Sequence, residues 1–341
     1  MNIYLVESPM QLLSAIEAKE YFQDKNSLLI VKNVLKDDYN KVMSELITFS
    51  KWNKIIKIKY PLSTYVMLYH LFKLKISKTK INNIFIGFPK TRTFQWFCEN
   101  LNNNKIFLLD EGVATINFQN NFFIKKNYLQ KNDFLYIKKE KKTIQKIKNI
   151  FKIFIKRYIF NLRGKNKIIY NLFSCFQLKI NSEQEYYCNK YNYTKKQISN
   201  LNIKKDMIYF YGSPLSENNI INFNIEIKLL NKIKKNYQNK ILFYIPHPSD
   251  SKKKILYLQK IGFKIKKNDT MAEIEPIKSQ ILPEEISSFL STTLYTLPKI
   301  YHYTQVLAFK IPNEHINSRL QAIEKLYNEY EKDKDIKVIS I

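Results

Sequence analysis

Three short polar motifs could carry chemistry, because each adjoins an apolar run that predicts a buried strand. In chain order they are Asp110-Glu111-Gly112, His247-Pro248 and Ser291-Thr292-Thr293. A carboxylate can accept a proton from an attacking hydroxyl, while an imidazole and hydroxyls can hold a departing phosphate. These residue types are what a metal-free transfer from a sugar nucleotide requires.

The acidic motif follows a strand predicted at residues 106–109. A strand end that delivers Asp110 and Glu111 into a site could supply a general base, and adjacent like charges would raise the pKa of one of them. The alternative is that Asp110 only caps the next helix. The acidic motif alone fits both interpretations.

The other two motifs suit an anionic ligand. His247 lies between Pro246 and Pro248, which restrict the backbone and hold the imidazole where it can donate to a phosphate oxygen. If a helix begins at the hydroxyl cluster 291–293, its first N–H groups also point at an anion. The alternatives are a solvent-exposed turn histidine and an ordinary helix N-cap.

Apolar runs alternate with helical patterns and predict an α/β fold with parallel sheets covered on both faces. Predicted strands in the first half are 3–6, 28–31, 55–58, 84–87 and 106–109, with helices near 10–16, 37–48, 64–74 and 93–101. Residues 114–180 break this rhythm. In the second half we predict strands 208–211, 241–245, 262–265, 286–290 and 336–341, and helices 225–237, 252–261 and 315–330. We therefore predict two domains, 1–180 and 181–341.

Glycine is scarce, with five residues, and three of them stand at predicted strand ends: Gly87, Gly112 and Gly212. Ligands bind at that edge of open α/β sheets. The chain has no G-x-G-x-x-G or Walker loop, which disfavours dinucleotide oxidoreductases and P-loop ATPases. It also lacks the residue spacing of a metal site.

Lys and Arg outnumber Asp and Glu by 57 to 29, giving a net charge of +28 and favouring an anionic partner. An AT-rich genome would give the same Lys bias without any function. A nucleic-acid-binding protein is disfavoured, because the aromatic residues are scattered through apolar strands.

Three distant cysteines without CxxC spacing favour a reducing compartment. With no signal peptide and no window near the roughly 18–20 apolar residues of a membrane span, we expect a cytoplasmic protein. The basic amphipathic stretch 142–167 predicts a helix. This helix either attaches peripherally to the anionic inner face of the inner membrane, or is a surface helix or an exchanged segment of a homodimer.

The ordered motifs resemble the signature shared by bacterial sialyltransferases, an acidic pair with Gly, then His-Pro, then a hydroxyl pair. These comprise the lipooligosaccharide sialyltransferases (glycosyltransferase family 52), the capsular polysialyltransferases and a multifunctional group. Residues 4–13 also resemble the start of the lipooligosaccharide family. The resemblance implies a GT-B fold of two Rossmann-like domains facing across a cleft. It also implies inverting transfer of sialic acid from CMP-sialic acid to a bacterial surface glycan, lipooligosaccharide or capsule, without a metal or other cofactor.

The same resemblance assigns roles to residues. Glu111 would be the base, with Asp110 as second choice and Glu217 in reserve, and His247 would be the acid or phosphate stabiliser. The residues implied in donor binding are Pro248, Gly212, Ser291, Thr292 and Glu273, with Glu275 close behind Glu273. The alternative enzyme is a GT-B glycosyltransferase that uses another nucleotide sugar, a hexose or another nonulosonic acid.

Overall fold

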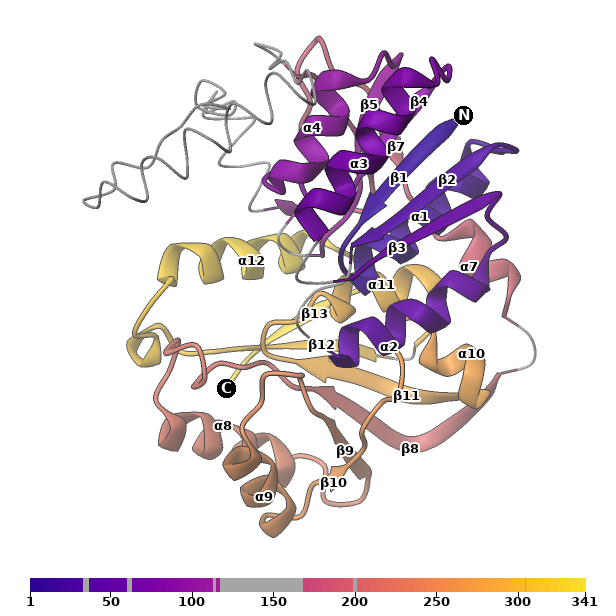
Figure 1. The fold of residues 1–341 in the computed structure, drawn as a ribbon. Coiled ribbons are helices and arrows are strands. Elements are labelled where there is room, and N and C mark those ends of the chain that lie inside the picture. The colour runs from indigo at the N-terminus through magenta and orange to yellow at the C-terminus, as the bar shows by residue number, and fades with distance from the viewer. Residues whose placement is uncertain (33–36, 60–62, 113–114, 117–167, 199–200, 304) are drawn as a thin grey trace. The chain divides into compact units, whose positions relative to one another are not determined.

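Two parallel β-sheets organise the chain in the computed structural model. The structure describes residues 1–32, 37–59, 63–112, 115–116, 168–198, 201–303 and 305–341 (Figure 1). These residues form two units, Met1–Asn189 and Lys190–Ile341, and each is described by itself.

The described residues of the first unit form one sheet of seven parallel strands. They are β1 (Asn2–Val6), β2 (Ser27–Lys32), β3 (Lys54–Ile58), β4 (Asn83–Ile86), β5 (Lys105–Leu108), β6 (Tyr170–Ser174) and β7 (Tyr186–Cys188). Their order across the sheet is β3-β2-β1-β4-β5-β6-β7. The chain therefore winds outward from β1 in one direction and then from β4 in the other, so the topological switch point of this Rossmann-like sheet lies between β1 and β4.

Helices cover both faces of this sheet, as right-handed crossovers in opposite directions require. Helix α1 packs against α2, and α3 packs against α4 (Figure 1). Their bounds are α1 (Pro9–Tyr21), α2 (Asp37–Leu46), α3 (Ser63–Ile76) and α4 (Arg92–Asn100), with a 3-10 turn at Ile47–Phe49. Helix α1 begins as its sequence predicts, because Ser8 is the N-cap, accepting from the Gln11 N–H, and Pro9 takes the first helical position.

An aromatic stack runs across three neighbouring strands of the first sheet. Tyr4 stacks on Phe85 at 4.5 Å between ring centroids, and Phe85 stacks on Phe107 at 4.8 Å. These residues are register partners on β1, β4 and β5, so their side chains emerge from the same face. The stack stabilises the centre of the sheet beside the switch point.

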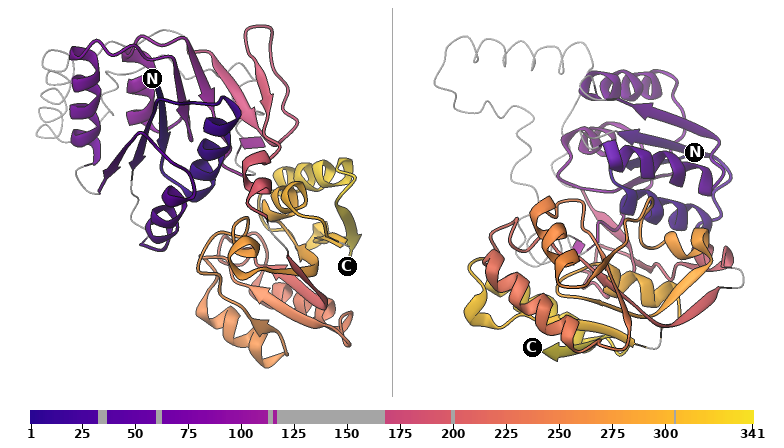
Figure 2. Two further views of the ribbon diagram at one scale, coloured as in Figure 1. Left: turned by 90° about the vertical axis from the view of Figure 1, so that its right-hand side faces the viewer. Right: turned by 90° about the horizontal axis from the view of Figure 1, so that it is seen from below.

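The second unit repeats this winding. Its strands are β8 (Asn202–Tyr211), β9 (Ile241–Ile245), β10 (Lys264–Ile265), β11 (Ile281–Ser288), β12 (Gln305–Lys310) and β13 (Lys337–Ser340). The order β10-β9-β8-β11-β12-β13 places the switch point between β8 and β11. The helices are α7 (Asn192–Lys196), α8 (Phe223–Lys235), α9 (Lys252–Lys260), α10 (Glu275–Ser279), α11 (Thr293–Ile300) and α12 (Leu320–Lys332). Figure 2 gives two further views.

The predicted α/β class of two successive Rossmann-like domains, as in the GT-B fold, is confirmed. The first unit ends at Asn189 and not at 180, because β6 and β7 extend its sheet. The C-terminal helix begins at Leu320 and not at 315, because residues 313–315 form a separate 3-10 turn. The predicted basic helix 142–167 lies outside the described residues.

The charged side chains buried in the described chain are mostly acids, seven Asp and Glu against two Lys. They are Glu17, Lys19, Glu99, Asp110, Glu226, Lys254, Glu273, Glu275 and Glu285. Burying a charge costs free energy unless the charge is paired or hydrogen-bonded, so partners are expected around each of these side chains. No helix among the described residues is both long and apolar enough to span a bilayer.

Candidate functional site

Glu111 lies just beyond the carboxyl end of β5 and is held by residues from the start of α1. Its carboxylate accepts from the Ser8 hydroxyl at 3.1 Å and from the Gln11 side-chain amide. The Gln11 amide oxygen accepts from the Glu7 N–H at 2.8 Å, which fixes the orientation of the amide. A Cβ at Gly87 would overlap the Gln11 side chain, so the end of β4 needs glycine here.

Burial raises the pKa of Glu111 to about 7, although the bonds from Gln11 and Ser8 oppose the rise and the charge of Glu7 adds to it. Glu7 follows β1, where it forms an ion pair with Lys32 at 2.8 Å and accepts from the Thr91 hydroxyl. Glu111 is therefore a carboxylate with a proton affinity suited to general-base work near neutral pH.

Asp110 differs from its neighbour. It is fully buried, and it accepts from the Ser174 hydroxyl at 2.5 Å and from the Cys175 N–H at 2.7 Å. These bonds tie the end of β5 to the end of β6, while burial raises the pKa of Asp110 to about 6. Asp110 thus holds two strand ends together, and of the two acids only Glu111 is partly exposed to solvent. Gly112 follows with a φ of 68°, in the region that favours glycine.

In the second unit, serine hydroxyls join the ends of β8 and β11 at the switch point. The Ser213 hydroxyl donates to the Leu290 carbonyl at 2.7 Å and lies 3.3 Å from the Ser288 hydroxyl. Ser288 in turn donates to the Tyr211 carbonyl at 2.7 Å. The loop after β8 and the segment leading to Ser291 are thereby held together.

His247 follows β9 in a turn that Asp250 closes. The His247 N–H donates to the Asp250 carboxylate at 2.8 Å, and the Asp250 N–H donates to the His247 carbonyl at 2.8 Å. The same carboxylate oxygen accepts from the Tyr244 hydroxyl at 2.8 Å. The imidazole Nδ1 accepts from the Ser249 N–H at 3.1 Å, which assigns the neutral ring proton to Nε2.

The loop after β8 lies against this turn. A Cβ on Gly212 would come within 2.5 Å of both the Asp250 carboxylate and the Tyr244 hydroxyl, so this approach requires glycine. Pro248 is exposed beside His247. Gly212, His247 and Pro248, which the sequence separates, are therefore neighbours around Asp250.

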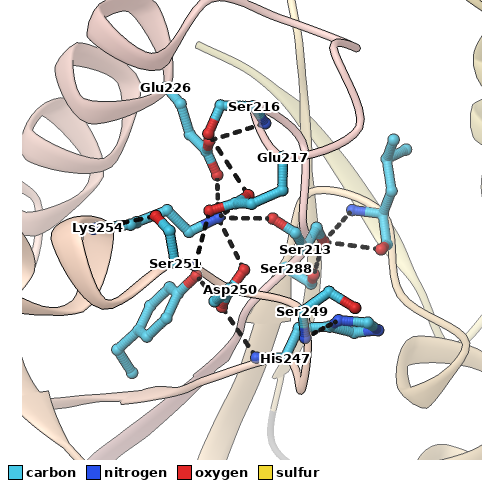
Figure 3. Close-up of polar contacts among 12 residues, drawn as sticks. Ser213, Ser216, Glu217, Glu226, His247, Ser249, Asp250, Ser251, Lys254 and Ser288 are labelled. Atoms are coloured by element: carbon cyan, nitrogen blue, oxygen red, sulfur yellow. Dashed lines mark hydrogen bonds and ion pairs between the residues drawn. The ribbon is translucent and has the colours of Figure 1, made fainter.

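Lys254 on α9 has a fully buried side chain, and its ammonium is surrounded by acids (Figure 3). Its Nζ lies 2.7 Å from Glu226, 2.8 Å from Asp250 and 3.0 Å from Glu217. It also donates to the Ser213 carbonyl at 3.0 Å. Burial alone would lower the pKa of Lys254, but Glu226 and Asp250 raise it, so the side chain stays charged.

Glu217, the reserve base of the prediction, is one of these acids. Burial would raise its pKa, but the Ser251 N–H at 2.9 Å and the Lys254 ammonium lower it below the ordinary value. A carboxylate with a lowered pKa and a bound ammonium is a poor proton acceptor. The geometry therefore favours Glu111 over Glu217 as a base.

The hydroxyl cluster leads into α11, with Thr292 as the N-cap residue. The Ser291 and Thr293 hydroxyls lie 2.7 Å apart. The Tyr330 hydroxyl on α12 bonds both the N–H and the carbonyl of Ser291, at 3.1 and 2.9 Å. A helix therefore begins directly at the hydroxyl cluster, at the carboxyl end of β11 beside the switch point, and the anion-binding role of this helix start stays a prediction.

Glu273 lies beneath this helix. It is buried, accepts from the Thr296 hydroxyl at 2.5 Å, and has a pKa that burial raises. Glu275 is also buried and pairs with Lys266 at 2.8 Å. Glu273 thus contacts α11 whereas Glu275 pairs with Lys266, and the preference for Glu273 as the ribose-binding acid stays a prediction.

The sequence analysis missed several residues that hold the candidate site residues in place, above all Gln11, Asp250 and Lys254. Lys254 stands in a run of three lysines that predicts a solvated surface. Its only signal is helical spacing, because it precedes the buried Leu258 by four residues. Among the described residues, no group of three or more His, Cys, Asp or Glu side chains is arranged to hold a metal ion.

Two Rossmann-like units with polar groups at the carboxyl ends of parallel strands are the architecture of GT-B glycosyltransferases. Residues 2–310 match the alpha-2,8-polysialyltransferase family (POLYST), and the chain belongs to this family. It is thus a sialyltransferase-type glycosyltransferase. The predicted sialyltransferase resemblance is confirmed at this level, while the closer likeness to glycosyltransferase family 52 stays a prediction.

No curated protein matches the chain. Among solved structures, the α/β-galactoside α-2,3-sialyltransferase of Photobacterium phosphoreum aligns with 99% of this chain and 97% of its own, at 13% identity and a TM-score of 0.47. The UDP-GlcNAc 2-epimerase of Methanocaldococcus jannaschii aligns with 99% and 88%, at 11% identity and a TM-score of 0.49. That of Neisseria meningitidis, bound to UDP-GlcNAc, aligns with 97% and 92%, at 11% identity and a TM-score of 0.48.

Proposed function

We propose that this protein transfers sialic acid from CMP-sialic acid to a hydroxyl of a bacterial surface glycan, with inversion and without a metal. The family name suggests an α-2,8 linkage, in which O8 of an acceptor sialic acid attacks C2 of the donor sugar. The acceptor glycan would belong to a capsule or to lipooligosaccharide. The observation that carries the proposal is the Glu111 carboxylate, held beyond the end of β5 by the Ser8 hydroxyl and the Gln11 side-chain amide, in a member of this family.

In the first unit, Glu111 would take the proton from the acceptor hydroxyl. A base is most effective when its pKa lies near the working pH, and such a group contributes roughly 10²–10⁴-fold to the rate. Ser8 and Gln11 keep the carboxylate in one orientation through their hydrogen bonds. Asp110 would hold the strand end in place and take no part in proton transfer.

In the second unit, the groups beside the switch point would bind the donor phosphate. His247 would donate the Nε2 proton of its neutral ring, and the hydroxyls of Ser291 and Thr292 lie at the start of α11. Glu273, beneath the same helix, would hold the donor ribose. Gly212 and Pro248 line the His247 turn, on the donor side of the reaction.

The reaction needs a single displacement. The donor is linked to its phosphate in the β configuration and the product is α, so direct attack with loss of CMP accounts for inversion without a covalent intermediate. Glu111 would accept the proton of the attacking hydroxyl, and His247 would stabilise the phosphate that leaves with CMP.

The test is a donor panel with purified protein in the presence of EDTA. CMP-sialic acid, UDP-hexoses, GDP-hexoses and CMP-linked relatives of sialic acid are each incubated with a sialyl-terminated acceptor, and nucleotide release and product mass are measured. We expect release of CMP alone and an acceptor longer by whole sialic acid residues. Glu111→Gln should lose most turnover, whereas Glu185→Gln, which breaks an exposed pair with Lys105, should not. Preference for a uridine or guanosine donor would refute the proposal.

A further inference from the structure

The buried Lys254 cluster, formed by Lys254 with Glu217, Glu226 and Asp250, lies directly behind the His247 turn (Figure 3). Resting on the proposed role of His247 at the donor phosphate, we infer that Lys254 is a positioning residue. Through Asp250 it fixes the place and tautomer of the His247 imidazole. It touches neither of the reacting groups itself.

Asp250 makes the connection, because its two carboxylate oxygens have different partners. Oδ2 accepts from the His247 N–H and the Tyr244 hydroxyl, both at 2.8 Å. Oδ1 lies 2.8 Å from the Lys254 ammonium. The carboxylate therefore meets the His247 N–H and the Lys254 ammonium at once, so Lys254, together with the Tyr244 hydroxyl, fixes its orientation towards that N–H. That backbone turn in turn presents the Ser249 N–H to the imidazole Nδ1.

Lys254 is itself held from two further directions. Glu226 on α8 pairs with it through Oε1, while the other oxygen accepts from the Ser216 N–H at 3.1 Å. Glu217 contacts it through Oε2 and accepts from the Ser251 N–H, at the N-cap of α9, through Oε1. Each acid thus uses one oxygen on the ammonium and the other on a backbone N–H of a loop. Such a network is rigid only when all its members are present.

The Lys254 ammonium also holds the three carboxylates together. Without it they would repel each other. The ammonium is fully buried and lies 2.7–3.0 Å from all three, which offsets their mutual repulsion. Lys254 also donates to the Ser213 carbonyl. Because the Ser213 hydroxyl donates to the Leu290 carbonyl, the same network reaches the segment next to Ser291.

The test uses two variants that weaken this link differently. Asp250→Asn keeps an oxygen for the His247 N–H and removes the charge that faces Lys254. Lys254→Met with Glu226→Gln removes the ammonium and one of the charges that it neutralises, so that folding is less impaired than in Lys254→Met alone. The matched control is Lys253→Met, which makes the same change one residue away on the exposed face of α9. Glu226→Gln alone measures the share of the second substitution in the double variant.

The first readout needs no substrate. The imidazole nitrogens of the four histidines are observed by NMR in labelled protein, and His247→Gln assigns the His247 signals. We expect an Nε2–H tautomer for His247 in the native protein and in the Lys253→Met control. In both test variants the His247 signals should shift or broaden, while circular dichroism shows a folded chain.

The second readout is turnover with CMP-sialic acid. Misplacing a catalytic group without removing it should lower kcat on the order of 10–100-fold and leave the donor KM nearly unchanged. Native His247 signals and native kcat in folded Asp250→Asn and in the double variant would overturn the inference. If the unmodified enzyme shows no turnover with CMP-sialic acid, the proposed function fails, and the His247 signals still decide the positioning role of Lys254.

Discussion

Gln11 donates its side-chain amide to Glu111, a residue 100 positions later in the chain. The same amide accepts from the Glu7 N–H, so one side chain links the end of β1 to the end of β5. Glu7 raises the pKa of Glu111 through its charge, whereas Gln11 lowers it through its bond. Two neighbouring residues therefore act on the pKa of Glu111 in opposite directions.

The first prediction concerns the pH dependence of activity. If ionised Glu111 is the base, kcat/KM should rise with pH through an apparent pKa of about 7. Glu7→Gln removes a like charge and should move this rise to lower pH. Gln11→Met removes a donor to the carboxylate and should move it to higher pH. Shifts in the same direction, or none, would argue against Glu111 as the titrating group.

The second prediction separates the effect of Glu111 on the stability of the protein from its effect on activity. Its folded pKa of about 7 exceeds the ordinary 4.5, so the native state binds more protons than the unfolded state between these values. The ionised carboxylate therefore destabilises the fold progressively as pH rises from about 4.5 to about 7. Glu111→Gln removes this cost, so its melting temperature relative to the native protein should increase between pH 5 and pH 8, although turnover is lost. A variant that loses stability more at pH 8 than at pH 5 would contradict the assignment.

The third prediction concerns Gly212. Its absent Cβ leaves room for Asp250 and Tyr244, so Gly212→Ala should displace the His247 turn and cost about 1–3 kcal/mol of unfolding free energy. Gly262→Ala is the control, because its φ of 95° gives a backbone cost of about 1–2 kcal/mol while its Cβ would meet only Lys234 at 3.5 Å. Chemical denaturation should show comparable losses of unfolding free energy in the two variants. Turnover should fall in the Gly212 variant alone.

The fourth prediction concerns the support of the hydroxyl cluster. Tyr330→Phe leaves the N–H and carbonyl of Ser291 without their partner, and should cost about 1–3 kcal/mol and raise the donor KM. Tyr327→Phe is matched in chemistry, since the Tyr327 hydroxyl on the same helix bonds the Phe309 carbonyl and the Ile311 N–H. It should cost similar stability without changing KM. An equal rise of the donor KM in both variants would show that the effect comes from α12 as a whole and not from the contact with Ser291.

The alternation of apolar runs was enough to predict the strands that carry the three motifs, because buried parallel strands are nearly continuous in apolar residues. Strands β6 and β7 were missed, since β6 lies inside the irregular stretch 114–180 and β7 follows directly after it. Strand β11 was predicted only from 286, because Pro283, Glu284 and Glu285 interrupt its apolar pattern, where its register with β8 also shifts.

The site was predictable where chemistry appears in a short motif and not where it depends on packing. Glu111 and His247 are conspicuous by type and position. Nothing local distinguishes Lys254 from the two lysines before it, because its role arises from acids on other elements. The same holds for Gln11, whose partner is set by the strand order of the sheet.

The burial of acids has a consequence for how other molecules meet this protein. With seven acids and two lysines withdrawn from solvent among the described residues, the exterior is more positive than the net charge of +28 indicates. A polyanion that binds this exterior would gain affinity by releasing counterions. Its binding should therefore weaken steeply as salt is added.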